Sequence, residues 1–506
     1  MKAKLTLSRD FQVCKIDNRI YSSFVEHMGR CVYNGIYEPT HETADENGFR
    51  NDVKELVRDL NLSVIRYPGG NFVSNYRWED GVGPRESRPK TLNAAWTQLE
   101  PNEVGTDEFH AWAKELGVDV MMATNLGTRG MEEAGQLLEY CNLDTDTPYA
   151  RMRAENGHPE PYRDRLWCLG NEMDGSWQVG ACKPEDYADI AQKTAHYLKL
   201  LDPEVELAAC GSANSSMPTF GLWEQAVLER AYNQIDYLSL HQYIRQHGDN
   251  ETEYLGAAAD MEQYIHTVIS LCDAVGGKKH TKKKINLSFD EWNVWPRTRE
   301  TDGTDRWGVG TVREEYYFSM LDALVFSTML NTLLRNAERI KVACFAQLVN
   351  VCAPIMTVPG GSVWKQTIYY PFMYASKYGR GALLDMRLEC PTYTAGRYGE
   401  VAYLDTVAVY NEERGEVTIF AVNRSEEEKV ELPVSLAGFG EVSLIEHVVM
   451  EADDRHARNS AQQPDLVVPR TVCDRTTASA QRADICVHPL SWNMIRLKVS
   501  PEKQEA

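Results

Sequence analysis

The sequence predicts an α/β protein built on a (β/α)8 barrel, joined to a second domain that is an antiparallel β-sandwich. Three observations predict this fold. Short apolar runs alternate with longer stretches of helical periodicity, which is typical of βα units. There are eight such runs, the number that closes a barrel. From about residue 384 onward the pattern is strand-like only, and 506 residues exceed the usual size of a single domain.

The eight expected strands begin at intervals of about 30 to 55 residues, enough for a strand, a helix and a sizeable loop. They are Ser23 to Glu26, Leu62 to Tyr67, Val118 to Thr124, Leu166 to Gly170, Val205 to Cys210, Ile235 to Leu240, Ile285 to Phe289 and Ile340 to Ala346. Apolar stripes at helical spacing predict helices between them, among which are Val53 to Leu60, Glu108 to Leu116, Pro184 to Leu201 and Arg313 to Asn336.

The C-terminal part alternates apolar and polar residues with a period of two, as in Val401 to Tyr410 and Val417 to Val422. Turn-forming clusters separate these segments, and the opening stretch from Ala3 to Val13 has the same alternation. We therefore expect a catalytic barrel over residues 16–383. Residues 1–15 together with 384–506 should form a jelly-roll-like sandwich.

Composition excludes several classes of partner. The chain carries 74 acidic and 53 basic side chains, a formal charge of -21, which disfavours binding to nucleic acid. It has no apolar run of the roughly 20 residues that a membrane span needs, and charged residues interrupt its first 17 positions, so no signal peptide is expected. The 12 cysteines lack zinc-site spacing. We therefore expect a cytoplasmic protein with free thiols. No metal or other cofactor is expected either, because the pair of carboxylates described below can supply the chemistry.

Polar residues follow the predicted strands where each strand ends, and in a barrel of this kind the active site lies at these carboxyl ends. We expect all of them to face one cavity. They are Glu26 and His27, Arg66 and Asn71, Asn171 and Glu172, His241 and Tyr243, the segment from Asp290 to Asn293, and Gln347.

Two of these residues, Glu172 and Glu291, follow the fourth and seventh strands on opposite sides of the barrel mouth. A facing pair of carboxylates is what cleavage of a glycosidic bond requires. One protonates the leaving oxygen, and the other attacks the anomeric carbon or activates water. Taken singly, Glu172 also fits a first-turn acid of the next helix, and Glu291 fits a solvated strand end.

The remaining strand-end residues have two interpretations each. Arg66 fits a buried ion-pair partner and His241 a core histidine, but their positions favour contact with a sugar. Asn171 suits a hydrogen bond to a sugar 2-hydroxyl, and Tyr243 suits one to a carboxylate, which would hold Glu291 ionised. Three tryptophans in loops after the second, fourth and seventh strands suit stacking on sugar faces or packing against the loops: Trp96, Trp177 and Trp295.

Four segments carry a family resemblance: IRYPGGNF (65–72), CLGNEMDG (168–175), SLHQY (239–243) and SFDEWNVW (288–295). In this order they resemble the α-L-arabinofuranosidases of glycoside hydrolase family 51. The resemblance implies that Glu172 is the acid/base and Glu291 the nucleophile. It implies that Trp96 and Trp295 line the leaving-group side, and that the protein is a homo-oligomer, a hexamer or trimer. The positions that it implies for holding the arabinose are Glu26, Arg66, Asn71, Asn171, Tyr243 and Gln347.

The expected function is that of a retaining, exo-acting α-L-arabinofuranosidase. It would remove terminal non-reducing residues from oligosaccharides derived from arabinan and arabinoxylan, by double displacement, with carboxyl groups roughly 5 to 5.5 Å apart. Asn75 and Pro101 depart from the family pattern near the leaving-group side and leave the aglycone preference open. Two alternatives remain: an endo-β-glucanase or β-xylosidase on the same scaffold, and a non-catalytic carbohydrate-binding barrel.

Overall fold

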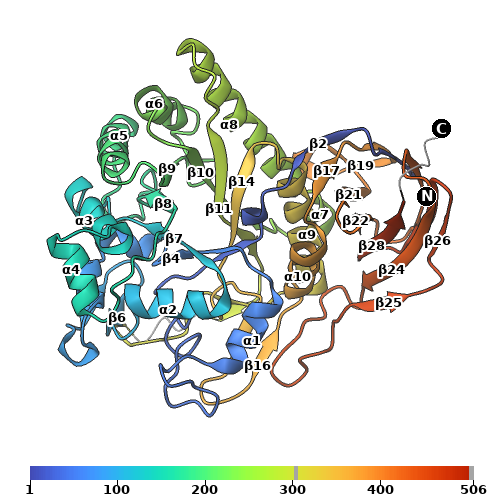
Figure 1. Ribbon diagram of the computed structural model, residues 1–506. Helices are drawn as coiled ribbons and strands as arrows, with labels where there is room; N and C mark the ends of the chain where they lie inside the picture. The colour runs from blue at the N-terminus through green and yellow to red at the C-terminus, as the bar shows by residue number, and fades with distance from the viewer. Residues whose placement is uncertain (301–305, 501–506) are drawn as a thin grey trace.

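The computed structural model describes residues 1–300 and 306–500, and its centre is a closed barrel of eight parallel strands (Figure 1). Each barrel strand pairs with the next one along the chain, and the last pairs with the first. All eight predicted strands are confirmed, although the sixth and seventh run several residues further than expected. The barrel strands are β3 (Ser22–Phe24), β4 (Val64–Tyr67), β7 (Asp119–Ala123), β8 (Leu166–Leu169), β9 (Glu206–Cys210), β10 (Tyr237–Arg245), β11 (Asn286–Trp295) and β14 (Ile340–Ala346).

Helices surround the barrel, and their apolar faces pack on it. The prediction for residues 184–201 is confirmed exactly by α5, but α9 begins at Met320 instead of Arg313. Ser319 and Asp322 explain this later start, because each side chain accepts the other's backbone N–H and so caps the helix. The helices are α1 (Asn51–Asp59), α2 (Thr106–Leu116), α3 (Met131–Asn142), α4 (Pro148–Glu155), α5 (Pro184–Leu201), α6 (Leu222–Ala231), α7 (Glu251–Leu255), α8 (Ala258–Lys278), α9 (Met320–Arg335) and α10 (Tyr369–Tyr378).

Short hairpins and 3-10 turns lie in the loops between these elements. The hairpins are β5 (Thr91–Asn93) with β6 (Gln98–Glu100), β12 (Arg299–Glu300) with β13 (Glu315–Tyr316), β15 (Ile355–Thr357) with β16 (Val363–Lys365), and β19 (Thr392–Thr394) with β20 (Glu400–Ala402). The 3-10 turns are η1 (Asn18–Ile20), η2 (Asn71–Asn75), η3 (Trp78–Gly81), η4 (Arg85–Ser87) and η5 (Gly396–Tyr398).

Two further sheets form the predicted sandwich beside the barrel, and they hold both the first strand and the last described strand of the chain (Figure 1). One has the order β18 (Arg387–Glu389), β1 (Lys4–Ser8), β23 (Val430–Ala437), β27 (Arg482–Val487) and β26 (Thr476–Ser479). The other has the order β2 (Gln12–Lys15), β17 (Ala382–Leu384), β21 (Leu404–Asn411), β22 (Glu416–Asn423), β28 (Ser491–Val499), β24 (Val442–Met450) and β25 (Arg470–Val472).

The N-terminal stretch contributes one strand to each sheet of the sandwich. Its pairings follow the antiparallel expectation except where β1 runs parallel to β23. Leu5 and Leu7 point into the apolar core between the sheets. The exact domain division, after residues 15 and 383, stays a prediction: β17 spans the second boundary, and residues 501–506 of the predicted sandwich lie outside the described residues.

The barrel interior is filled with side chains. Phe24, Met121, Cys168 and Val342, from four different strands, are buried in one apolar cluster. A packed interior leaves only the carboxyl ends of the strands for a ligand. All twelve cysteines, which lie within the described residues, are free thiols. In the described part of the chain, no helix has the length and hydropathy to cross a membrane.

Candidate active site

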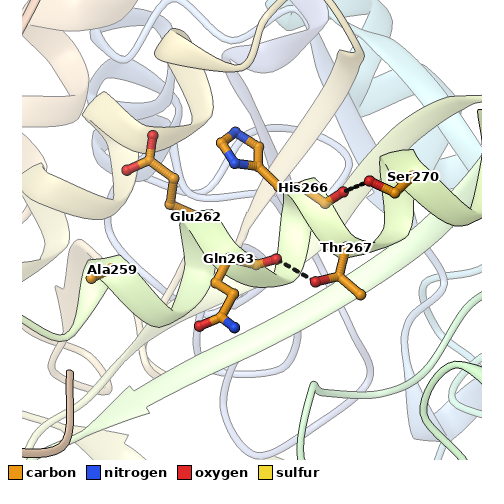
Figure 2. A pocket seen from close by; sticks show the side chains of 6 residues that line it. All are labelled: Ala259, Glu262, Gln263, His266, Thr267 and Ser270. Atoms are coloured by element: carbon orange, nitrogen blue, oxygen red, sulfur yellow. Dashed lines mark hydrogen bonds between the residues drawn. The ribbon is translucent and has the colours of Figure 1, made fainter. Parts of the chain in front are cut away.

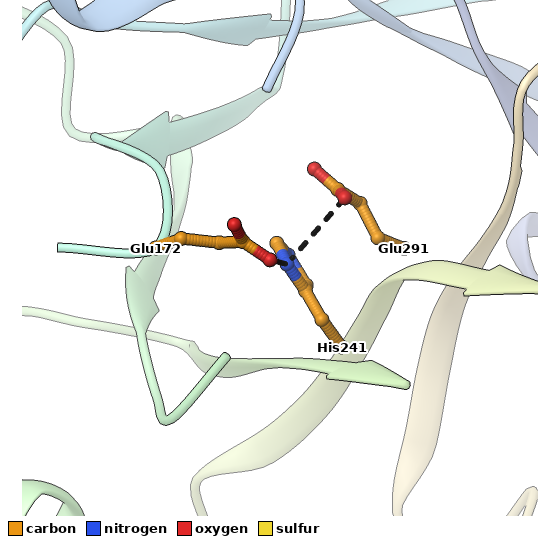
Figure 3. A group of neighbouring side chains, drawn as sticks. All are labelled: Glu172, His241 and Glu291. Atoms are coloured by element: carbon orange, nitrogen blue, oxygen red, sulfur yellow. Dashed lines mark hydrogen bonds and ion pairs between the residues drawn. The ribbon is translucent and has the colours of Figure 1, made fainter. Parts of the chain in front are cut away.

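Glu172 and Glu291 lie together at the barrel mouth with His241 between them (Figure 3). One oxygen of each carboxylate and one ring nitrogen of His241 all lie within 4.8 Å of one another. Glu172 follows β8 in a left-handed conformation, with φ of 43°, which costs a residue other than glycine about 1 kcal/mol or more. The contacts of its carboxylate hold it there.

A β-bulge brings two consecutive acidic residues to the same side of β11. The register with β10 shifts between Ser239 and His241, and the register with β14 shifts over the same stretch of β11. Neighbouring residues of a regular strand point to opposite faces, but at this bulge both Asp290 and Glu291 contact His241 and Arg66. Asp290 is therefore part of the site, as expected from its place at the strand end, although the alternation of a regular strand would put it and Glu291 on opposite faces.

Arg66 and Tyr243 hold the Glu291 carboxylate. Arg66 Nη1 donates to Oε1 at 2.7 Å, and the expected hydrogen bond from the Tyr243 hydroxyl to Oε2 is present at 2.8 Å. Arg66 also donates to Asn171 at 2.7 Å and is fully buried among acidic neighbours, which keep its pKa well above the usual range. These contacts match the ion-pair interpretation of Arg66. Its role in holding a sugar stays a prediction.

His241 is a cation at neutral pH. Its Nδ1 lies 2.9 Å from Glu172 Oε1 and 3.6 Å from Glu291 Oε2, and its Nε2 lies 3.1 Å from Asp290 Oδ1. Burial would lower the pKa of the imidazole, but the three carboxylates outweigh it and raise this pKa to about 10.

Asp290→Asn should destabilise the protein most near pH 7, and less as the pH approaches 10. A histidine with a raised folded-state pKa contributes stability that is complete below its unfolded value of about 6.5 and is lost as the pH rises through about 10. Without Asp290 the folded-state pKa of His241 is lower, so this loss is complete at a lower pH. Thermal unfolding of both proteins at several pH values between 7 and 10 measures the difference.

A matched control for this variant is Asp405→Asn. Asp405 is also buried, but it pairs with Arg335, which keeps its charge over this pH range. Its destabilisation should stay constant between pH 7 and 10. An equally constant difference for Asp290→Asn would contradict the assignment of a charged His241.

Glu26 anchors the opposite wall of the site. Its Oε1 accepts the Phe72 amide at 2.9 Å and the Trp96 indole N–H at 2.8 Å, and its Oε2 accepts the Gln347 amide at 3.2 Å. Burial, followed by the charge of Glu291, raises the pKa of Glu26 to about 7. Within the described residues Gln347 Oε1 is buried without a partner, so it is available to a hydroxyl donor.

Two glycines after β4 let the chain pass close to the carboxylates of Glu26 and Glu291. A Cβ on Gly69 would lie 2.5 Å from Glu26 Cγ, and one on Gly70 would lie 2.8 Å from Glu291 Oε1. Asn71, which follows them, accepts a hydrogen bond from Asn171 at 3.1 Å. The predicted sugar-holding residues are thus brought together at the barrel mouth. Their roles remain untested.

Trp177, like Trp96, has a polar contact that sequence reasoning did not give. Trp177, half exposed, donates from its indole N–H to Glu172 Oε2 at 2.6 Å. It was expected only to stack or pack, and its place five residues after Glu172 is the signal that was missed. Trp295 stacks on Tyr243 with ring centres 4.4 Å apart, and the Arg245 guanidinium lies 3.7 Å from its ring centre.

The two departures from the family pattern lie near Trp96. Asn75 Oδ1 accepts the Ala94 amide at 3.1 Å, in the hairpin that carries Trp96, and Pro101 directly follows β6 of the same hairpin. The aglycone preference stays open.

A separate depression of about 430 Å³ lies on α8 (Figure 2). It is lined by one face of that helix, where Thr267 and Ser270 donate to carbonyls of their own helix. None of its lining residues stands at a strand end, and the depression carries none of the chemistry described above.

The barrel with two carboxylates facing each other at its mouth defines the protein as a glycoside hydrolase. Residues 56–264 match the model of the α-L-arabinofuranosidase 1 domain, and residues 290–491 match the α-L-arabinofuranosidase C-terminal domain. The chain belongs to the α-L-arabinofuranosidases of glycoside hydrolase family 51, the family that its sequence resembled.

Similar proteins cover nearly the whole chain. An intracellular exo-α-(1→5)-L-arabinofuranosidase of Acetivibrio thermocellus is 47% identical over 98% of this chain and 99% of its own. One of Bacillus subtilis, with the same description, is 46% identical over 98% and 99%. The solved structure of a family 51 α-L-arabinofuranosidase from Bifidobacterium longum superposes with a TM-score of 0.94, at 40% identity, over 98% of this chain and 99% of that one.

Proposed function

We propose that this protein removes terminal non-reducing α-L-arabinofuranosyl residues from short oligosaccharides, with retention of configuration. The observation that carries the proposal is the pair Glu172 and Glu291, with oxygens within 4.8 Å of each other. This close approach of single oxygens supports the short separation of retaining enzymes, roughly 5 to 5.5 Å between carboxyl groups, over the roughly 6.5 to 9.5 Å of inverting ones.

In the first step Glu291 attacks the anomeric carbon, and Glu172 protonates the departing oxygen. Arg66 and Tyr243 aim the nucleophile, because each donates to a different oxygen of its carboxylate. In the second step the ionised Glu172 removes a proton from water, which releases the sugar from Glu291. The donors His241 and Trp177, one on each oxygen of Glu172, suit this ionised form.

The His241 cation offsets the electrostatic repulsion among the three neighbouring carboxylates in this buried site. In the free enzyme its pKa of about 10 lies well above neutral pH, so it enters the reaction as a cation. We assign the proton that moves in catalysis to Glu172, and His241 acts by position and charge.

The substrates that fit are soluble fragments of arabinan or arabinoxylan, taken up and cleaved in the cytoplasm. The relatives with intracellular exo-α-(1→5)-L-arabinofuranosidase activity in their names support this choice. A homo-oligomer, trimer or hexamer, remains a prediction. The proposal needs no metal or organic cofactor, because the two carboxylates supply both proton transfer and nucleophile.

A panel of nitrophenyl glycosides tests the activity. We expect kcat/KM for the α-L-arabinofuranoside to exceed that for the β-D-xyloside and the β-D-glucoside by roughly 100-fold or more, because the site's polar groups are arranged for one sugar. Arabino-oligosaccharides should release arabinose one residue at a time from the non-reducing end. Preference for either β-glycoside, or release of internal fragments, would favour the alternative glycanase function.

A further inference from the structure

Asn93 links the loop that carries Trp96 to the end of the first barrel strand. Its side-chain Nδ2 donates to the His27 carbonyl at 2.6 Å, and its Oδ1 accepts the Trp96 backbone amide at 3.2 Å. Asn93 is the last residue of β5 and is 2% exposed, so both bonds are shielded from water. One side chain thereby fixes Trp96 relative to the residue that follows Glu26.

The hairpin has other attachments: Asn75 accepts the Ala94 amide at 3.1 Å, and further bonds hold the second strand and the residue before it. Gln98 accepts the Gly29 amide at 2.8 Å and donates to Thr311 at 2.7 Å. The Thr97 carbonyl accepts the Trp307 amide at 2.8 Å. These bonds anchor β6 on both sides. Within the described residues, two side chains bond the Trp96 backbone: Thr97 donates to its carbonyl at 2.7 Å, and Asn93, which also reaches the His27 carbonyl, accepts its amide.

The position of Trp96 matters because its indole N–H reaches into the site. It donates to Glu26 Oε1 at 2.8 Å, the same oxygen that accepts the Phe72 amide. A small movement of the Trp96 backbone would break this contact, since hydrogen bonds weaken steeply with distance and angle. The Glu26 carboxylate would then lose one of the donors that orient it toward the sugar site.

We propose that Asn93 is a positioning residue for substrate binding, which acts by holding the Trp96 indole on Glu26. This inference rests on the proposed function only for its activity readout. Asn93 touches neither the reacting atoms nor the catalytic carboxylates. Its removal should thus weaken substrate binding more than it slows the chemical step.

Asn93→Ala should raise KM for nitrophenyl α-L-arabinofuranoside about 10-fold, with kcat lowered less than 3-fold. Steady-state kinetics measure this split. Asn93→Ser also removes the amide donor to the His27 carbonyl without burying a charge, so it should raise KM in the same direction. It serves as the second variant if Asn93→Ala does not fold.

A double-mutant cycle with Trp96→Phe separates positioning from general stability. In the Trp96→Phe background, Asn93→Ala should change kcat/KM by less than about 2-fold, because the contact that it supports is already absent. Asn102→Ala removes an equally buried amide from the same loop, one that donates to the Pro89 carbonyl at 2.7 Å. It should lower thermal stability and leave kcat/KM unchanged.

An equal loss from Asn93→Ala in both backgrounds, or no loss in either, would overturn the proposal. A readout that needs no activity keeps it testable if the wild-type protein does not cleave arabinofuranosides. Among the eleven tryptophans, labelled as fluorotryptophan, the Trp96 fluorine NMR signal is identified by Trp96→Phe. It should shift or broaden in Asn93→Ala and not in Asn102→Ala. An unchanged signal would refute the positioning role, whatever the substrate.

Discussion

Glu291→Gln should lower kcat/KM for every arabinofuranoside by roughly 10⁴- to 10⁶-fold, whatever the leaving group. An amide cannot form the glycosyl-enzyme ester, and it also lacks the negative charge that stabilises the developing oxocarbenium ion. The glutamine keeps the size of the side chain next to Arg66 and Tyr243, so the pocket should keep its shape. Assays with nitrophenyl and oligosaccharide substrates measure the loss.

The matched control is Glu133→Gln. Glu133 is a buried carboxyl group on α3, 4% exposed, and it is not one of the groups assembled at the barrel mouth. Its kcat/KM should stay within about 2-fold of the wild type. If Glu291→Gln kept more than a hundredth of the activity, the carboxylate of Glu291 would not be the nucleophile.

Glu172→Ala should produce a loss that depends on the leaving group. Oligosaccharides, whose departing oxygen needs a proton, should lose roughly 10³-fold or more in kcat/KM, near the full contribution of general acid catalysis. Dinitrophenyl arabinofuranoside needs little protonation, so its first step should persist. The glycosyl-enzyme should then accumulate, because no base activates water for the second step.

Azide should accelerate turnover of the dinitrophenyl substrate by Glu172→Ala, because it is an anion and needs no general base. The product should be arabinofuranosyl azide with the configuration of the substrate. Trp177→Phe is a useful comparison, since it removes a donor to Glu172 and keeps the carboxylate. It should respond to neither leaving group nor azide in this way. An equal loss on both substrates for Glu172→Ala would rule out an acid/base role.

The fold was readable from the sequence because each barrel strand is buried on both faces and therefore appears as a short apolar run. The ends of these runs also located Glu172 and Glu291, since a closed parallel barrel brings all carboxyl ends to one rim. The start of α9 was missed because the apolar stripe continues upstream of the Ser319 cap. Local hydrogen bonds, not hydrophobicity, decide where that helix begins.

The sequence pattern did not predict how the side chains of the site are oriented. The period of two on β11 would separate Asp290 from Glu291, and only the bulge brings both to His241. The charge of His241 depends on three carboxylates: Asp290 and Glu291 on β11, and Glu172 in the turn after β8. No local sequence pattern shows that they surround His241. The link from Asn93 to the His27 carbonyl is likewise a tertiary contact.

The most direct test of the account is a peptide mass map of Glu172→Ala, quenched with acid during turnover of dinitrophenyl α-L-arabinofuranoside. A covalent intermediate on the nucleophile is the central claim, and this variant should hold it long enough to detect. We expect one peptide to gain the mass of a single anhydro-arabinose, and fragmentation to place it on Glu291. No adduct despite continued release of dinitrophenol, or an adduct on Glu26, would contradict the account.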